Sequence, residues 1–468
     1  MFSSIALVLA FAVLLVPLAV YAGPPVLKAL SGEPVERQTA LPSYQRPPAE
    51  LFPNPVVQPL DPSAPVPDPA ALGSMLDAEL SLTSGGTFSA VVADALTGEV
   101  LYENNPDAAG MPASTLKILT GVAVGATLDP EARFETTVQA ARADGDTVLT
   151  LRGGGDVLLG SGESSEDAVV GHAGLATLAQ KALRALGPVA GTIRVQVDDS
   201  LFSGPALSPA WNSADVEAGE IAPVYPLAVN SAWADESSQA GPRVDDAALT
   251  AGEAFRNALA GSAGAGITVA DEVERGQAPA GSRELASVES ATVAEQIGQM
   301  LLVSDNYLAE ALARSAAAAS GREASFDGAA AAVAGELSRL GVDTAGLSLA
   351  DVSGLGAENS VSAAQLAETV RLVLTSENEG LRAVARGLPV AGLTGTLQGR
   401  YGDGAAAGLV RAKTGTLRTV TALSGYVTDT DGRLLSFALV ARDLDGNTAE
   451  ARAAVDSAAA VLAGCGCR

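Results

Sequence analysis

Residues 113–126 read A-S-T-L-K-I-L-T-G-V-A-V-G-A, and this stretch decides how the chain is interpreted. Its apolar residues recur at helical spacing, which predicts a buried helix that Ser114 opens. Lys117 follows on the same helix face, so its amine would lie beside the Ser114 hydroxyl. A serine hydroxyl is a weak nucleophile until a base takes its proton, and a desolvated lysine can serve as that base. The spacing therefore predicts a Ser–Lys pair, with a capping serine and a solvent-reaching lysine as the plainer alternative.

A second motif, Ser304-Asp305-Asn306, lies at the break between two helical stretches. Ser304 would relay a proton between Lys117 and a leaving amine, and Asn306 would hydrogen-bond a substrate amide and the base. Taken alone, the motif is equally typical of a helix cap, because serine, aspartate and asparagine all cap helices well.

A third motif, Lys413-Thr414-Gly415-Thr416, is expected at the end of an apolar strand at 409–412. Lys413 would offer a positive charge to a carboxylate, and Gly415 would let a substrate backbone approach the strand. The plainer alternative is an edge strand guarded by lysine. The three motifs together, in the order S-x-x-K, S-x-N, K-T-G, favour a single active site.

The composition narrows the chemistry further. Only four of the 28 basic residues are lysines, and two of them fall in these motifs. Lysine can be deprotonated in a protein, whereas arginine cannot. The one histidine, His172, stands near the expected start of a helix with no serine nucleophile signature nearby. We therefore predict a structural or surface histidine, and neither a histidine triad nor a metal site. A net charge of −26 argues against a nucleic-acid surface.

The first part of the chain predicts export. Residues 5–22 are unbroken apolar sequence, and we interpret residues 1–23 as a signal peptide or a membrane anchor, with both alternatives open. Residues 24–70 are rich in proline and predict an extended linker. Both interpretations place the remainder outside the cytoplasm, either secreted or anchored at the cell envelope.

The folded part is expected to be α/β (α+β), with strands at both chain ends assembled into one sheet. We assign residues 71–137 and 286–463 to an antiparallel sheet flanked by helices, and 138–285 to an inserted α/β region. Ser362 and Gln365 predict a capping box before a helix at 363–374. Residues 464–468 hold both cysteines, Cys465 and Cys467, and are expected to form a flexible tail.

With its motifs in place, the chain resembles the penicillin-recognising serine peptidases, specifically the penicillin-binding protein 4 type of D-Ala-D-Ala carboxypeptidase, peptidase family S13. The resemblance runs from about residue 75 to 462, over β-lactamase/transpeptidase-like sequence with a large insertion. Further stretches that carry it are G-G-G-D at 153–156, V-D-D-S-L-F at 197–202, I-A-P-V at 221–224, L-P-V-A-G at 388–392 and G-T-L at 395–397. The 190 positions from Ser114 to Ser304 match the family's insertion and exceed the spacing of a class A β-lactamase. The sequence departs from the family at Gly356-Ala357, where Ser-Arg is frequent, and at Val157, where proline is usual.

The resemblance implies that Ser114 attacks the carbonyl between two terminal D-alanines of a peptidoglycan stem peptide, with Lys117 as base. It further implies an oxyanion hole from the backbone N–H groups of Ser114 and Thr416, and no metal or organic cofactor. Lys413, Thr414 and Thr416 would hold the terminal carboxylate. β-Lactams would acylate the same serine, and the membrane would be met only through the N-terminal segment.

Two competing functions use the same residues differently. One is a β-lactamase or esterase, although no Glu-x-x-Asn pattern that would position a deacylating water follows Asn306. The other is a catalytically silent wall-binding protein, which the intact motifs argue against. The sequence leaves open the choice between carboxypeptidase and cross-link-cleaving endopeptidase, the stem-peptide diamino acid and the oligomeric state.

Overall fold

The computed structural model describes residues 60–467 apart from 84, 188–190, 265 and 403. These belong to one folded unit, residues 60–468. The predicted signal peptide or anchor, 1–23, and most of the predicted linker, 24–70, lie outside the described residues. In the part that the structure describes, no helix is both long and apolar enough to cross a bilayer.

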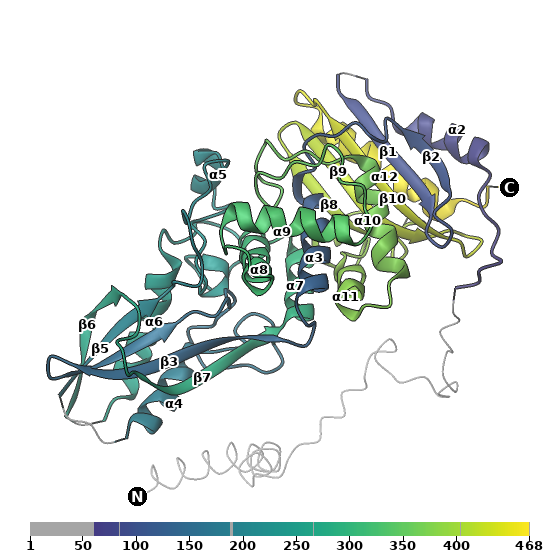
Figure 1. Cartoon of the computed structure of the whole chain (residues 1–468). Coiled ribbons are helices and arrows are strands. Elements are labelled where there is room, and N and C mark those ends of the chain that lie inside the picture. Colours follow the sequence, from purple (N-terminus) through teal and green to yellow (C-terminus); the bar gives the residue numbers. More distant parts are fainter. Residues whose placement is uncertain (1–59, 84, 188–190, 265, 403, 468) are drawn as a thin grey trace, which may run out of the picture. The chain divides into compact units, whose positions relative to one another are not determined.

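The first sheet is antiparallel and combines strands from both ends of the folded unit (Figure 1). Its order is β2-β1-β10-β9-β8. The strands are β1 (Thr87–Asp94), β2 (Val100–Asn104), β8 (Arg411–Leu417), β9 (Val420–Thr428) and β10 (Leu434–Arg442). Every residue of β10 is buried, because helices cover both faces of the sheet.

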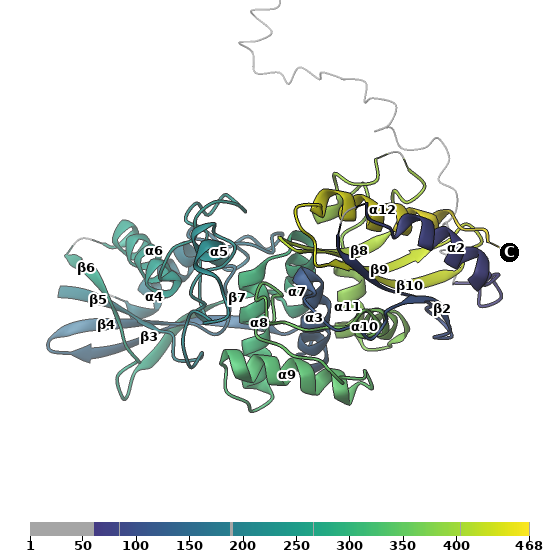
Figure 2. The same ribbon diagram turned by 90° about the horizontal axis from the view of Figure 1, so that it is seen from above.

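One face of this sheet carries α2 (Pro69–Glu79) and α12 (Thr448–Gly464), and the other carries α10 (Ala363–Thr375) and α11 (Glu379–Gly387), as Figure 2 shows. Behind α10 and α11 lies α3 (Leu116–Thr127), which is buried over residues 116–125. A helix that is apolar on all sides needs neighbours on all sides. The remaining neighbours of α3 are α7 (Val293–Val303), α8 (Asn306–Ala319) and α9 (Phe326–Arg339).

The second sheet has the order β6-β5-β4-β3-β7 and mixes parallel and antiparallel pairs. Its strands are β3 (Arg133–Ala143), β4 (Asp146–Arg152), β5 (Gly191–Asp198), β6 (Ile267–Arg275) and β7 (Arg283–Thr292). Helices α4 (Leu175–Leu186) and α6 (Ala247–Ser262) pack on it around a separate apolar core. The short α5 (Ser213–Glu217) lies in the connection between β5 and α6. Strands β3 and β7 extend beyond positions 138 and 285, the expected limits of the inserted region.

The α+β fold class predicted from the sequence is confirmed, including the sheet built from both ends. Helix α10 also begins as predicted, because Gln365 N–H donates to Ser362 Oγ at 3.1 Å and Ser362 N–H donates to Gln365 Oε1 at 3.0 Å. One strand was predicted wrongly. Strand β8 begins at Arg411 and runs to Leu417, so the third motif lies inside the strand and not at its end. The ladder with β9 continues through these polar residues, which an apolar pattern does not reveal.

The C-terminal residues also differ from the expected flexible tail. Helix α12 ends at Gly464, and Cys465 is buried and disulfide-bonded to Cys467. The Asp68 N–H donates to the Cys467 carbonyl at 2.8 Å, so residues 465–467 pack against the start of the described chain. The bridge joins residues only two apart, so it constrains the end of the chain and does not define the fold.

Candidate active site

Ser114 lies in a 3₁₀ turn, Ala113–Thr115, which leads directly into α3. Ala113 has a left-handed backbone with φ 49°, which is uncommon for a residue with a side chain. Two close approaches hold this turn. A Cβ on Gly415 of β8 would come within 2.9 Å of the Pro112 carbonyl, and one on Gly354 within 2.0 Å of the Ala113 carbonyl. Glycine at both positions is therefore required for the turn to sit between β8 and the loop at 351–356.

Lys117 is fully buried one turn into the helix, and its Nζ has three oxygen partners. They are Ser114 Oγ at 3.1 Å, Asn306 Oδ1 at 2.6 Å and the Ser353 carbonyl at 2.7 Å. Burial lowers the pKa of Lys117 to about 8, and the carboxylates of Asp351, Asp305, Glu310 and Glu220 oppose part of that shift. A lysine with such a pKa carries a substantial neutral fraction near neutrality, as a base must.

The second motif bridges two helices, as the sequence predicts. Ser304 ends α7 in a left-handed conformation with φ 63°, and Asp305 caps α8 by accepting from the N–H groups of Tyr307 and Leu308. Asn306 is the first residue of α8, and its Nδ2 donates to the Glu220 carbonyl at 2.9 Å. Asn306 is thus oriented at both ends of its amide, with its oxygen facing Lys117.

The third motif lies on β8, the edge strand beside the Ser114 turn. Lys413 Nζ donates to Ser304 Oγ at 2.8 Å and to the Thr414 carbonyl at 2.9 Å. Its pKa lies well below the usual value, because the side chain is buried and Lys117 carries the same charge. The Thr414 and Thr396 hydroxyl oxygens are 2.9 Å apart, and Thr416 is exposed further along the strand.

The structure thus brings together residues from all three motifs, with Thr416 exposed at the far end of the third. Ser114 and Lys117 contact each other, Lys117 contacts Asn306, and Ser304 contacts Lys413. A cavity of about 240 Å³ adjoins the second motif and is lined by the segments 218–220 and 239–243 together with α7. His172 lies outside this cluster, where Arg133 Nη1 is 2.7 Å from its Nε2, in a turn before α4.

Sequence reasoning missed three groups of the cluster. The Ser353 and Glu220 carbonyls are backbone atoms, which no residue type announces, and Thr396 lies in a stretch to which no chemistry was assigned. The signal available for one of them was its position, since Thr396 falls in the G-T-L stretch at 395–397 that carries the family resemblance. Among the described residues, no group of three or more histidine, cysteine, aspartate or glutamate side chains is arranged to hold a metal ion.

The antiparallel sheet with helices on both faces, together with a serine–lysine pair at the start of a buried helix, places the chain in the class of β-lactamase/transpeptidase-like serine enzymes. Within that class, the chain belongs to the D-Ala-D-Ala carboxypeptidase 3 (S13) family, whose model matches residues 73–239 and 232–463. The chain therefore has the hydrolytic function of this family, which acts on peptidoglycan and hence at the cell envelope, outside the cytoplasm.

Individual relatives agree with this assignment. The chain is 39% identical over 426 residues to carboxypeptidase DacB of Mycolicibacterium smegmatis, and the matched region covers 90% of this chain and 89% of that protein. It is 36% identical over 417 residues to carboxypeptidase Rv3627c of Mycobacterium tuberculosis, covering 88% and 87%. The crystal structure of penicillin binding protein 4 from Haemophilus influenzae matches the fold with a TM-score of 0.65 at 22% identity, covering 83% of this chain and 98% of that one.

Proposed function

We propose that Ser114 is the nucleophile of a D-Ala-D-Ala carboxypeptidase and that Lys117 is the base of acylation. The observation that carries this proposal is the set of contacts around Lys117 Nζ. If the amine is neutral, its two hydrogens go to Asn306 Oδ1 and the Ser353 carbonyl, and its lone pair accepts the Ser114 hydroxyl proton. The Ser114 oxygen then bonds to the carbonyl carbon of the penultimate D-alanine.

The remaining residues take roles that follow from their positions. As the C–N bond breaks, Ser304 gives its hydroxyl proton to the leaving D-alanine amine and takes up the proton that Lys117 received from Ser114. Lys413 Nζ orients the Ser304 hydroxyl by donating to its Oγ at 2.8 Å. The backbone N–H groups of Ser114 and Thr416 face the oxyanion, a contribution worth about 10²–10³ in rate for each donor. Water then hydrolyses the acyl-enzyme and releases the shortened peptide.

Substrate recognition falls to β8 and to Asn306. Burial lowers the pKa of Lys413, and a substrate carboxylate placed beside it favours its protonated form. Lys413 then binds the terminal carboxylate with the hydroxyl groups of Thr414 and Thr416, and the Asn306 amide binds the peptide amide. Gly415 leaves room for the substrate backbone along the strand. A β-lactam presents a carboxylate and a strained amide to the same groups, so we expect it to acylate Ser114.

The proposed activity is tested by measuring D-alanine release from a stem pentapeptide. Wild-type protein should release D-alanine, Ser114→Ala should release none, and Ser203→Ala, a change at an exposed serine, should match wild type. The same peptide with an amidated C-terminus should be hydrolysed poorly, because Lys413 loses the carboxylate. Release by Ser114→Ala at the wild-type rate would contradict the assignment, and cleavage of a cross-linked dimer alone would assign the endopeptidase activity instead.

We further propose the division of the chain into a catalytic domain, 71–137 with 286–463, and inserted subdomains, 138–285. The separate apolar core that the second sheet forms with α4 and α6 supports a distinct inserted part. Its limits fall inside β3 and β7, and Val288 of β7 also belongs to that core. For residues 1–23 we propose a cleaved signal or a retained anchor as the sole membrane contact. N-terminal sequencing of the protein from the cell envelope decides between them, because a mature chain that starts near residue 24 requires cleavage.

A further inference from the structure

A buried carboxylate lies behind the catalytic cluster, on the same helix as Asn306. Glu310 follows Asn306 by four residues on α8 and is fully buried. Its Oε1 accepts hydrogen bonds from two consecutive backbone N–H groups, Val352 at 3.0 Å and Ser353 at 2.9 Å. Glu310 belongs to none of the three motifs, and its hydrogen bonds go to the 351–356 loop instead of to Ser114 or β8.

The two residues whose N–H groups Glu310 holds, Val352 and Ser353, turn their carbonyls toward α3. The Val352 carbonyl accepts from Thr120 Oγ1 at 2.5 Å, and the Ser353 carbonyl accepts from Lys117 Nζ at 2.7 Å. The backbone of Ser353 therefore connects Glu310 to the proposed base, because its N–H donates to Glu310 Oε1 and its carbonyl accepts from Lys117 Nζ. Asp351 holds the other side of this loop, because it accepts from the N–H of Gly354, which shares a peptide group with the Ser353 carbonyl, and from the N–H of Gly356.

Arg314 supplies the opposite charge one turn further along α8. It is buried, and its guanidinium stacks on the Phe326 ring at 3.7 Å from the ring centre. Burial raises the pKa of Glu310 to about 8, whereas Arg314 and the backbone N–H groups favour its ionised form. Buried carboxylates are expensive unless opposite charge and hydrogen-bond donors lie near them. Glu310 has donors at Oε1 and the charge of Arg314 nearby, but its buried Oε2 has no hydrogen-bond partner, which agrees with the raised pKa.

We propose that Glu310 is a positioning residue of the acylation step: by holding the 352–353 backbone, it fixes the Ser353 carbonyl and thereby directs the Lys117 lone pair at Ser114. This rests on the proposed function, since it presupposes Lys117 as base. Glu310 is ionised only above about pH 8, and there its negative charge also favours the protonated form of Lys117. The other charged groups that act on Lys117 are Asp351, Asp305, Glu220 and Lys413, and each remains in place when Glu310 is changed.

Two substitutions separate the two effects. Glu310→Gln keeps an oxygen that can accept from Val352 and Ser353 but removes the charge, whereas Glu310→Ala removes both. The matched control is Asp94→Asn. Asp94 is equally buried, accepts from two backbone N–H groups, Leu96 at 2.8 Å and Thr97 at 3.0 Å, and pairs with Arg433, but it lies on β1, away from the three motifs.

The experiment measures the second-order rate of acylation of the full chain by a chromogenic β-lactam between pH 5 and 10. We expect Glu310→Ala to lower the high-pH plateau by about 10²-fold, as a misplaced base would. Glu310→Gln should keep the plateau within about tenfold, because its amide oxygen still accepts from the Val352 and Ser353 N–H groups. The acid limb should stay within about 0.5 unit of wild type, because Glu310 carries its charge only above about pH 8. Asp94→Asn should lose thermal stability without moving the acid limb.

The proposal is overturned if Glu310→Gln loses as much of the plateau as Glu310→Ala, or if Glu310→Ala acylates as fast as Asp94→Asn. Should Glu310→Ala fail to fold, Glu310→Asp takes its place, because it draws the carboxylate back from the Val352 and Ser353 N–H groups and should lower the plateau more than Glu310→Gln does. A wild-type protein that does not acylate at any pH would instead refute the proposed function, so the two failures are distinguishable.

Discussion

Lys117 has no solvent contact, and each of its three partners is an oxygen of the protein. An ammonium in this position would use all its hydrogens as donors and would leave Ser114 unactivated. A neutral amine satisfies the Asn306 and Ser353 oxygens and still has a lone pair for the serine proton. The arrangement therefore suits the unprotonated lysine, and the depressed pKa makes that form accessible.

A pH dependence follows from this balance. The pKa of Lys117 is lowered from 10.5 to about 8, so the amine is protonated below about pH 8 and neutral above it. The acylation rate should rise with pH up to about 8, with a slope of about tenfold per unit on the acid side, and then level off. Stopped-flow acylation by a β-lactam measures this profile.

Two variants test whether the rise of the acylation rate below pH 8 is due to Lys117. Lys117→Arg should lose about 10²–10⁴-fold in acylation rate, because arginine keeps the charge but cannot act as base. Lys181→Arg, a change of an exposed lysine, should retain the wild-type profile. An acid limb that persists in Lys117→Arg would mean that another group is titrating.

At the scale of elements, the site depends on how closely β8 approaches the Ser114 turn. A Cβ on Gly415 would lie 2.9 Å from the Pro112 carbonyl and 3.2 Å from the Ser114 N, and backbone atoms cannot move away as side chains do. Gly415→Ala should therefore displace β8 and lower kcat/KM by about 10²-fold or more. Steady-state peptide hydrolysis measures this, and Gly432→Ala, in a turn between β9 and β10, would show the effect of a glycine change remote from the site. Wild-type kcat/KM in Gly415→Ala would refute the packing argument.

Asp305 joins the second motif to the segment that precedes α6. Besides capping α8, it pairs with the buried Arg243 at 3.6 Å and accepts from the Ser231 hydroxyl. Asp305→Ala leaves Arg243 without its charge partner, which should lower the free energy of unfolding by about 3–5 kcal/mol. Asp246→Ala is the matched change, because Asp246 caps α6 and pairs with the exposed Arg275, and it should cost about 1 kcal/mol. Equal losses in denaturant unfolding would show that the burial of Arg243 is unimportant.

Local patterns predicted the elements well where the signal is itself local. The α10 capping box and the pairing of Ser114 with Lys117 both depend on residues within one helical turn, so the sequence suffices. Strand β8 was misplaced because Lys413 and Thr414 interrupt the apolar run, although both are buried and continue the ladder with β9. The Ser353 carbonyl was beyond sequence reasoning, because its position depends on Glu310, which contacts this loop from about forty residues away in the chain.

At the scale of the molecule, the pairing of strands from both ends of the folded unit in the first sheet assembles the site. Strands β1 and β10 pair over eight positions, from Thr87 with Arg442 to Asp94 with Leu435, and this brings β8 beside the turn that precedes α3. The second sheet lies within the interval between the first two motifs, so its length does not disturb the site. The family resemblance predicted that the three motifs form one site. The pairing of β1 with β10 is the physical reason why the first and third motifs lie side by side.

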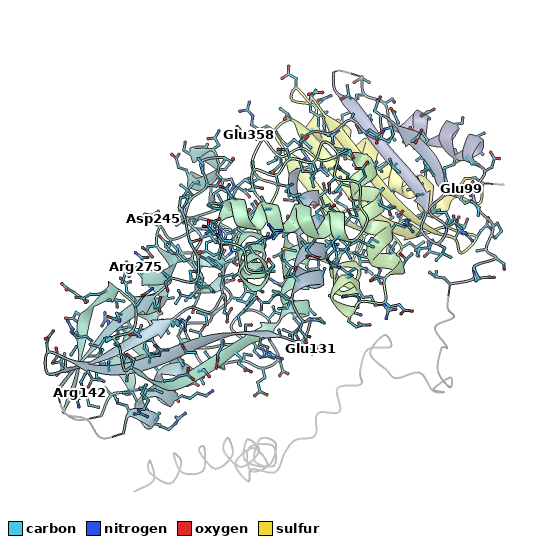
Figure 3. All side chains as sticks on the ribbon, viewed as in Figure 1. Glu99, Glu131, Arg142, Asp245, Arg275 and Glu358 are labelled. Atoms are coloured by element: carbon cyan, nitrogen blue, oxygen red, sulfur yellow. A yellow bond between two sulfur atoms is a disulfide. The ribbon has the colours of Figure 1, made fainter. Side chains whose placement is uncertain are left out.

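The net charge of −26 has a kinetic consequence for an anionic substrate. Exposed acids such as Glu99, Glu131, Asp245 and Glu358 are spread over the folded unit (Figure 3). Their field repels a peptide carboxylate at a distance, and salt screens it over about 10 Å at 0.1 M ionic strength. We expect kcat/KM for an acidic stem peptide to rise severalfold between low and physiological salt, while a peptide with added lysines shows the reverse. A fall for the acidic peptide would mean that Lys413 dominates the approach as well as the binding.

The central claim is that Ser114 becomes acylated with Lys117 as its base. The most direct measurement is to incubate the full chain with a fluorescent penicillin and locate the adduct by peptide mass spectrometry, with Ser114→Ala beside it. We expect one stable adduct on the peptide that contains Ser114, absent from the variant. Penicillin hydrolysis without an adduct would indicate a β-lactamase, and neither adduct nor hydrolysis in folded protein would refute Ser114 as the nucleophile.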